Sequence, residues 1–419
     1  MKAATMLLVP FVVLLLSAGA FAATTPDVER VPPTDETMAD LDVLVPDLMV
    51  FATEFYRHLG DDANLLFSPL SLSMAVGMVT AGARGETLSQ IEDAMNFSLD
   101  QGRLHPAFNA LDWLLEARGR LPEGYGEGFT LNLVNSLWGQ VGYDFLPAFL
   151  GTLGDFYGAG MRWIDFAADP ELARRTINAW VEEMTNDRIE ELLRPPHITA
   201  QTLLTLVNAV YFNAPWAFPF DPEDTEPGPF TLLDGSRVDV PMMHQTEIHR
   251  AARGEDYEAV QLDYNGNELS MLVVLPDEGA FADVESRLDP AFLDSLDDGL
   301  AREHVILTMP RFTFEWGAAI EGILQSMGIV DAFSGSSADF SGMDGTRTLF
   351  IGSVVHKAFV AVDEAGTEAA AATAIVMVGS GMTQPTYVTV TIDRPFLFLI
   401  RDNATGAILF MGRVLDPRG

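Results

Sequence analysis

The chain has 419 residues, 48% of them hydrophobic and 10% aromatic, with 24 basic and 60 acidic side chains and no cysteine. This composition suits a large packed core and excludes a disordered chain, disulfides, thiolate metal sites and a cysteine nucleophile. The formal net charge of −36 argues against nucleic acids and anionic membrane surfaces as partners.

The first 22 residues are typical of an export signal. They hold one lysine, an apolar run and the small-x-small pattern Ala20-Phe21-Ala22. The run is short for a membrane span and no basic cluster follows it, so we expect its removal and no membrane insertion of the mature chain. The protein is expected outside the cell or in the periplasm. Only Lys2 and Lys357 are lysines, a bias typical of high-GC or salt-adapted prokaryotes.

Residues 23–45 are acidic and proline-rich without an apolar period, which predicts a flexible leader. Pro46 is expected to open a helix, because its missing N–H is harmless in a first turn. Further helical periodicity covers residues 70–79, 87–95, 107–117, 147–157 and 170–193. Strand patterns cover residues 203–212, 259–262, 269–275, 304–314, 357–362, 387–392, 396–400 and 407–415. Helices first and strands later predict one α+β domain over residues 46–419, with mostly antiparallel sheets.

No catalytic motif stands out. The seven histidines show no HExxH spacing, and the sequence has neither a GxSxG elbow nor an SxxK motif. The Ser-Gly-rich segment 333–342 lacks the lysine of a phosphate-binding loop. With 60 acidic residues, no single pair of carboxylates is informative. We therefore expect no enzyme, no metal site and no cofactor.

Four separated segments resemble one family in collinear order. They are NLLFSPLSLSMAVGMVTAGARGETLSQI (64–91), NAVYFNAPWAFPFDPEDTEPGPF (208–230), VVHKAFVAVDEAGTEAAAAT (354–373) and RPFLFLIRDNATGAILFMGRVLDP (394–417). In that order they resemble helix B, strand 3A with the breach, strand 5A with the hinge, and the C-terminal strand pair of the serpins, the serine protease inhibitor superfamily.

The resemblance implies a fold with three β-sheets, about nine helices and an exposed reactive-centre loop at about 364–385. It also implies suicide inhibition. A serine endopeptidase, or by extension a cysteine endopeptidase, attacks the loop and is trapped as an acyl-enzyme when the cleaved loop inserts into sheet A. The expected partner is thus a target protease bound covalently by a monomer. The alternative is a non-inhibitory serpin acting as a carrier or structural protein.

The hinge of this loop fits a strand that must enter a sheet. The residues matching the hinge are Glu364, Gly366, Thr367, Glu368, Ala369, Ala370, Ala371, Ala372 and Thr373. Alternation directs Thr367 and the odd-numbered alanines toward the core and Glu368 away from it, so the charge need not be buried. Gly366 is expected to give the turn its freedom.

The position of the attacked bond has two solutions. Counting from the hinge as the family does gives the bond between Ser380 and Gly381, whereas counting back from Pro395 gives a later position near Gln384. The bond between Met382 and Thr383 is the alternative. Because no Lys or Arg lies between Lys357 and Arg394, a trypsin-like target is disfavoured, and elastase-, subtilisin- or chymotrypsin-like enzymes are favoured.

Two further sets of residues are carried over from the family. The shutter cluster, which would hold sheet A closed, matches Ser68, Ser71, Asn208 and His356, and the breach, where insertion would begin, matches Trp216. Taken one at a time, these residues are ordinary buried polar groups or a core aromatic.

Overall fold

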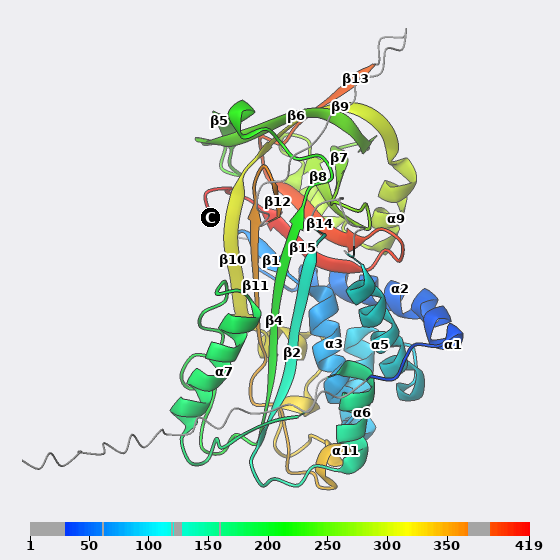
Figure 1. Ribbon diagram of the computed structural model, residues 1–419, viewed down its shortest axis with the longest axis vertical. Helices are drawn as coiled ribbons and strands as arrows, with labels where there is room; N and C mark the ends of the chain where they lie inside the picture. The colour runs from blue at the N-terminus through cyan, green and yellow to red at the C-terminus, as the bar shows by residue number, and fades with distance from the viewer. Residues whose placement is uncertain (1–29, 61–62, 119, 121–127, 159–160, 368–385) are drawn as a thin grey trace, which may run out of the picture.

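The structure is a computed structural model that describes residues 30–60, 63–118, 120, 128–158, 161–367 and 386–419. It has the expected α+β class, with a long six-stranded sheet in the middle of the molecule and a nine-stranded sheet across its upper part (Figure 1). Helices α2, α3, α5 and α6 pack on one side of the six-stranded sheet, and α7 lies on the other side.

The helices of the described residues lie mainly in the first half of the chain. They are α1 Asp35–Ala39, α2 Leu41–Arg57, α3 Pro69–Thr80, α4 Gly85–Met95, α5 Gln101–Ala117, α6 Pro147–Tyr157, α7 Pro170–Met184, α8 Phe281–Ser286, α9 Pro290–Gly299, α10 Glu321–Ser326 and α11 Ser341–Asp344, with 3-10 turns η1 Pro222–Asp224 and η2 Asp331–Phe333. Every residue of α3 is buried, so this helix forms the centre of the large core.

The six-stranded sheet has the strand order β10-β11-β12-β4-β2-β3. Its strands are β10 Phe312–Ala319, β11 Val355–Val362, β12 Gly366–Thr367, β4 Leu204–Pro215, β2 Thr130–Gln140 and β3 Arg162–Ile164. Strands β4 and β11 are parallel, and the two-residue β12 lies antiparallel between their upper parts.

The nine-stranded sheet has the order β1-β15-β14-β8-β7-β6-β9-β13, with β5 paired to β6. Its strands are β1 Leu65–Phe67, β15 Ile408–Val414, β14 Phe396–Asp402, β8 Leu269–Pro276, β7 Tyr257–Asp263, β6 Arg237–Arg253, β9 Ala301–Pro310, β13 Tyr387–Thr391 and β5 Glu226–Thr231. Three sheets were expected, but the described strands form two. The 17-residue β6 pairs with β5 over its first residues, with β9 from Met242 to Ala251 and with β7 over Arg250–Arg253, which joins two parts into one sheet.

The prediction that Pro46 opens a helix is wrong, because α2 begins at Leu41 and carries Pro46 inside it. Leu41, Leu44 and Val45 are buried in the core. Burial of each such side chain contributes about 1.5–3 kcal/mol, which together exceeds the roughly 3 kcal/mol that an interior proline costs. Residues 35–45 are therefore largely helical, and a flexible leader cannot extend to residue 45.

Other elements differ in their limits. The helix expected over 170–193 ends at Met184, because Asn186 and Asp187 have left-handed backbone conformations that a helix cannot contain. The single strand expected over 304–314 is two strands, β9 and β10, separated at Arg311. Strands β2 and β6 were not predicted.

Candidate functional site

The contact between β4 and β11 is short. The two strands pair in parallel only over Val207–Val210 and Val355–Ala358. Above this stretch β12 separates them, and below it their ends line a cavity of about 470 Å³ together with residues such as Leu203, Leu349 and Ile351. The six-stranded sheet is therefore held closed at this junction by about four residue pairs.

A row of polar side chains crosses the sheet at this closed stretch. His356 of β11 is the register partner of Asn208 of β4, which in turn is the register partner of Asn135 of β2. The Asn208 amide donates to the Ser71 carbonyl oxygen at 2.9 Å, to the Ser71 hydroxyl at 2.7 Å and to Asn135 Oδ1 at 2.6 Å. One asparagine thus ties two strands to the central helix α3.

His356 completes the row from the other strand. It is fully buried and contacts Asn208 Oδ1 through Nδ1, while its Nε2 accepts a hydrogen bond from the Ser68 backbone N–H at 3.1 Å. This arrangement requires a neutral ring that carries its proton on Nδ1. Burial lowers the pKa of His356 from 6.5 to about 3, so the ring stays neutral at ordinary pH.

The four predicted shutter residues therefore meet at one place. Ser68 also caps α3, because its hydroxyl accepts from the Ser71 backbone N–H at 3.2 Å and Pro69 occupies the first turn. The structure adds Asn135, which sequence reasoning missed because its strand was not predicted. The alternation of leucines with polar residues at 130–133 was the available signal.

The entrance above the shutter is formed by a tight turn. Asp363 Oδ1 accepts from the backbone N–H groups of Ala365 at 2.9 Å and Gly366 at 3.2 Å, which reverses the chain after β11. Thr367 then pairs with Val362 of β11 on one side and with Ala214 of β4 on the other. Thr367 of the expected hinge thus already lies between β4 and β11, while Glu364 stays in the turn.

Thr367 points into the large core. Its side chain is 1% exposed, and its hydroxyl shares a 2.7 Å hydrogen bond with the hydroxyl of Tyr264, which is itself fully buried. The inward direction agrees with the alternation expected from the sequence. Burial raises the pKa of Tyr264, so its hydroxyl keeps its proton and can share it with Thr367.

Trp216 is hydrogen-bonded to the turn and stacks on Tyr264. Its ring stacks on Tyr264 with centroids 4.7 Å apart and planes at 8°. Its indole N–H donates to the Asp363 carbonyl oxygen at 3.0 Å, and its backbone N–H donates to the Ala365 carbonyl oxygen at 2.9 Å. The predicted breach residue is therefore bonded directly to the chain that leads into the loop.

Gly366 serves a purpose other than the one expected. Its φ does not lie in the left-handed region, so the turn does not need the freedom of glycine at this position. A Cβ there would lie 2.1 Å from the Ala214 carbonyl oxygen and 2.7 Å from Pro215 Cα. Glycine is required because the new strand lies so close to β4.

Glu364 is a buried acid at the same turn, with only 6% of its surface exposed. Its carboxylate accepts from the Thr225 hydroxyl at 2.6 Å and pairs with Arg311 Nε at 3.3 Å. Its carbonyl oxygen accepts from the Phe220 backbone N–H at 2.9 Å. The carboxylate thus joins the turn to the η1 segment and to the β9–β10 connection.

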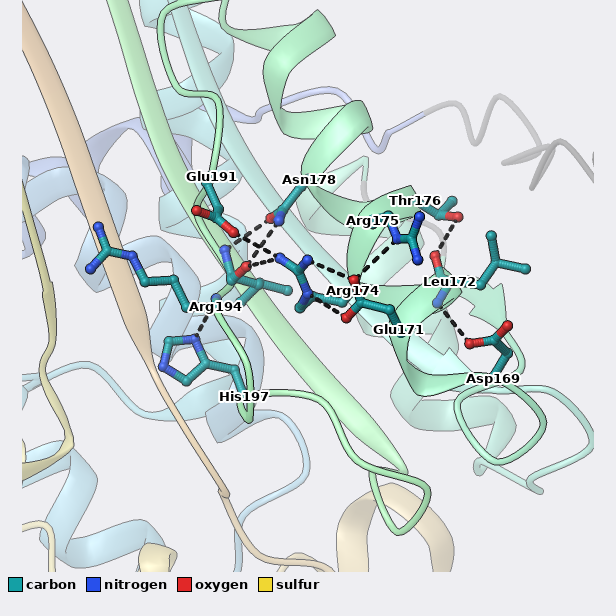
Figure 2. A network of polar contacts seen from close by, with 11 residues as sticks. Asp169, Glu171, Leu172, Arg174, Arg175, Thr176, Asn178, Glu191, Arg194 and His197 are labelled. Carbon is teal, nitrogen blue, oxygen red and sulfur yellow. Dashed lines mark hydrogen bonds and ion pairs between the residues drawn. The ribbon is translucent and has the colours of Figure 1, made fainter.

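Helix α7 and the segment after it cover the outer face of β4 and β11. Ile177 and Val181 of α7 pack with Val207 of β4 and Val355 of β11. Figure 2 shows the polar contacts that hold this cover together. Asn178 exchanges two 2.9 Å hydrogen bonds with the backbone of Leu193, and Arg174 adds another to the Leu193 carbonyl at 2.8 Å. Because α7 packs on both strands, β4 and β11 must slide beneath this helix when they separate.

Comparison with known proteins decides the family. The model of the family described as Serpin (serine protease inhibitor) matches residues 47–417. The chain belongs to the serpin family. The serpin is 38% identical over 370 residues to an uncharacterized serpin-like protein of Thermococcus kodakarensis, covering 88% of this chain and 84% of the relative. It is 37% identical over 380 residues to the human leukocyte elastase inhibitor, covering 88% and 97% respectively.

Solved structures agree with this assignment. A complex of thyroxine-binding globulin with thyroxine superposes with a TM-score of 0.78 at 30% identity, covering 90% of the serpin and all of that chain. The family therefore includes proteins named as protease inhibitors and a protein named for binding a small molecule.

Several predicted residues lie outside the described part of the serpin. These are the hinge residues Glu368, Ala369, Ala370, Ala371, Ala372 and Thr373 and the bond residues Ser380, Gly381, Met382 and Thr383, together with the export signal at 1–22. Within the described ranges, no group of three His, Asp or Glu side chains is arranged to hold a metal ion. No helix there is long and apolar enough to cross a membrane.

Proposed function

We propose that this serpin is a suicide-substrate inhibitor of serine endopeptidases. The observation that carries the proposal is β12, because Thr367 already pairs with both β4 and β11 and Gly366 pairs with β4. A loop that continues from Thr367 along the same line becomes the next residues of a central strand. The serpin itself turns over no substrate in this proposal.

The chemical step belongs to the protease. Its active-site serine attacks the carbonyl carbon of the scissile bond, an ester forms between the two proteins, and the new amino terminus leaves with the C-terminal part of the loop. The released N-terminal part then inserts between β4 and β11 and carries the attached protease with it. Hydrolysis of the ester competes with this movement, so rapid insertion is essential.

The sheet is suited to receive such a strand. Fourteen inserted residues extend about 46 Å, similar to the roughly 40 Å of the 12-residue β4 beside which they would lie. The lower ends of β4 and β11 flank the cavity of about 470 Å³, which provides space for the far end of the insertion. The shutter row must open first, and its polar groups can bond to the backbone of the new strand afterwards.

The target is an elastase-, subtilisin- or chymotrypsin-like enzyme in this proposal. The absence of Lys and Arg between Lys357 and Arg394 supports it, as does the similarity to an inhibitor named for leukocyte elastase. We assign the attacked bond to Ser380–Gly381, with Met382–Thr383 as the alternative. We also propose that the serpin is exported by its first 22 residues and acts as a monomer.

A second candidate function is transport of a small molecule without inhibition, favoured by the similarity to thyroxine-binding globulin. The small residues of the hinge argue against it, because Ala369 to Ala372 present no bulky or charged group to an opening sheet.

The test is to mix the purified serpin with elastase, subtilisin, chymotrypsin and trypsin. An SDS-stable complex with one of the first three, and none with trypsin, is expected. The same protease with its active serine blocked is the control and forms no such complex. The mass of the released C-terminal peptide identifies the bond, since the peptide begins at Gly381 or at Thr383. Cleavage of the loop without any stable complex contradicts inhibition and favours the carrier.

A further inference from the structure

The cavity at the lower ends of β4 and β11 has walls suited to an apolar molecule. We call it the lower cavity. Its volume of about 470 Å³ lies within the range of about 300–1,000 Å³ in which proteins hold small ligands. Leu137 of β2, Phe340 and Met343 of α11 form part of its wall, and all three are buried members of the large core. The lower cavity is therefore already formed while the sheet is closed.

The accessible part of the lower cavity is also apolar. Phe350 lines it and is 52% exposed. Leu203, Leu204 and Ile351 line it as well and are only half-buried. A ligand that covers these side chains removes apolar surface from water, which is favourable. The mouth and the wall together favour a hydrocarbon chain over a polar molecule.

Two hydrogen-bond donors lie on the segment that follows α7. His197 lines the lower cavity, and its Nδ1 accepts from the Arg194 backbone N–H at 3.1 Å, so the neutral ring carries its proton on Nε2. Figure 2 shows the side chains of Arg194 and His197 on the same side of this segment. Within the described ranges, neither His197 Nε2 nor the Arg194 guanidinium bonds to another protein group. A positive charge next to a free N–H suits a carboxylate.

Glu321 is an acid of the lower cavity whose carboxylate already has partners. It accepts from the Val354 backbone N–H at 2.9 Å and from the Ser353 hydroxyl. Both partners belong to the segment just before β11, so this charge stabilises the rim of the cavity. An anionic ligand therefore meets free donors at Arg194 and His197, whereas a cationic ligand meets a carboxylate that is already bonded.

We infer that the lower cavity binds a fatty acid. The hydrocarbon chain lies against Leu137, Phe340 and Met343, and the carboxylate lies at His197 and Arg194. A neutral apolar molecule would leave these donors without a partner. A small polar anion such as phosphate would leave the apolar wall uncovered, so both are poorer ligands.

A bound fatty acid affects the proposed inhibition. Leu204 and Leu206 of β4 and Val355 of β11 line the lower cavity, so the ligand lies between strand ends that must part when the cleaved loop inserts. The ligand must leave before insertion is complete, and hydrolysis of the ester then competes more effectively. The fatty acid is thus expected to turn the inhibitor into a substrate. This consequence rests on the proposed function, whereas the binding does not.

The binding test is isothermal titration calorimetry of the purified protein with decanoate below its micelle concentration. Acetate offers the carboxylate without the chain, and decylamine offers the chain with the opposite charge. Both should bind at least about tenfold more weakly than decanoate. Ile351→Trp, which fills the mouth, and Arg194→Glu, which reverses the charge, should each weaken decanoate binding about tenfold. Arg175→Glu is the matched control on α7, where Arg175 is exposed, and should leave the affinity unchanged.

The functional test mixes the wild type with the protease that it traps, with and without decanoate. At about ten times its Kd, a ligand that must leave first slows insertion about tenfold. The ratio of cleaved serpin to SDS-stable complex should rise by a similar factor, and Arg194→Glu should respond much less. Hydrolysis of a small chromogenic substrate checks that decanoate leaves the protease itself active.

The outcomes separate the two proposals. Failure of decanoate to bind overturns the inference while inhibition stands. Equal binding of decylamine, or decanoate binding that neither Ile351→Trp nor Arg194→Glu weakens, also overturns it, because the ligand then occupies another place. Binding that leaves the ratio of products unchanged overturns the effect on insertion. If no protease forms a complex but decanoate binds as expected, the proposed function fails and the fatty-acid site stands.

Discussion

Strands β4 and β11 are arranged differently at two stretches of the sheet in this serpin, the shutter and the breach. At the shutter, β4 and β11 are in direct contact and a row of neutral, buried polar groups joins them to β2 and α3. At the breach, a few residues higher, β12 already separates them. The closed stretch is short and its bonds can form again around a new strand. Under the proposed insertion mechanism, the separated stretch at β12 is a primed entrance and the joined stretch at the shutter is a locked middle.

The largest effect should come from the primed end. Thr367→Arg introduces a charged group where a side chain that is 1% exposed faces the core and bonds to Tyr264. Burying an unpaired charge is strongly unfavourable, so insertion should slow and the acyl-enzyme should be hydrolysed. We expect at least a tenfold loss of stable complex relative to cleaved serpin, measured by gel densitometry.

Thr367→Val is the matched variant for this position. It keeps the shape and removes only the hydrogen bond to Tyr264, so inhibition should be largely retained. Equal amounts of stable complex from Thr367→Arg and the wild type would mean that insertion does not pass through this position.

The second-largest effect is expected from a substitution in the shutter row. Asn208→Ala removes bonds to Ser71, Asn135 and His356 at once and leaves buried polar groups without partners. Each such group costs about 1–3 kcal/mol, so the apparent free energy of unfolding should fall by about 2–4 kcal/mol. Denaturant unfolding measures this, and spontaneous loss of inhibitory activity on storage should accelerate.

Asn132→Ala is the control on the neighbouring strand. Asn132 makes an exposed hydrogen bond to the Met184 carbonyl at 3.1 Å, away from the shutter row. Its replacement should change stability by about 0.5 kcal/mol or less. If both alanine variants lose the same stability, the shutter row has no special role.

A lower pH should reduce the stability that the shutter row contributes. His356 is neutral in the folded state, with its pKa lowered to about 3 by burial, whereas the unfolded chain takes up a proton near pH 6.5. The stability due to the neutral ring is therefore complete above pH 6.5 and is lost as the pH falls toward 3. Between pH 7 and pH 5 the loss from His356 is about 2 kcal/mol.

The measurement is the unfolding midpoint in denaturant as a function of pH. Burial also lowers the pKa values of His105 and His249 to about 4, so they add slopes of the same sign. His356→Gln should reduce the pH dependence by about one proton. An identical pH profile for His356→Gln and the wild type would show that the ring is not neutral in the folded state.

The smallest effect is expected at the cover formed by α7. Asn178→Ala removes the paired bonds to the Leu193 backbone and should lower the apparent free energy of unfolding by about 1–2 kcal/mol. Exchange of the backbone amides in β4 should accelerate. Arg175→Ala, which loses only an exposed contact with Glu171, should leave both unchanged; equal effects from the two variants would contradict a clamp at Asn178.

The shutter and breach could be located from the sequence, but their energetics could not. Asn208 and His356 are 148 residues apart, and only the resemblance to a family brings them together. Asn135 was missed because local alternation did not suffice to identify β2. The need for Gly366 arises from its distance to Ala214, which is a tertiary contact without a local signal.

The errors have similar causes. Pro46 was expected to begin a helix because local rules place proline in a first turn, but burial of Leu41 and Leu44 extends α2 toward the N-terminus. The end of α7 depends on left-handed residues at Asn186 and Asp187. Tertiary packing sets these element limits. In the second half of the chain, where the apolar residues alternate regularly, most strands were predicted correctly.

The central claim is that the loop becomes a strand between β4 and β11 once it is cut. The most direct measurement is the thermal midpoint of the serpin before and after its loop is cleaved by a protease that it does not trap, with the chain otherwise intact. A strand that grows by about 13 residues beyond Thr367 adds roughly one net hydrogen bond per residue, so the midpoint should rise by about 20 °C or more. An unchanged or lower midpoint after complete cleavage would contradict insertion.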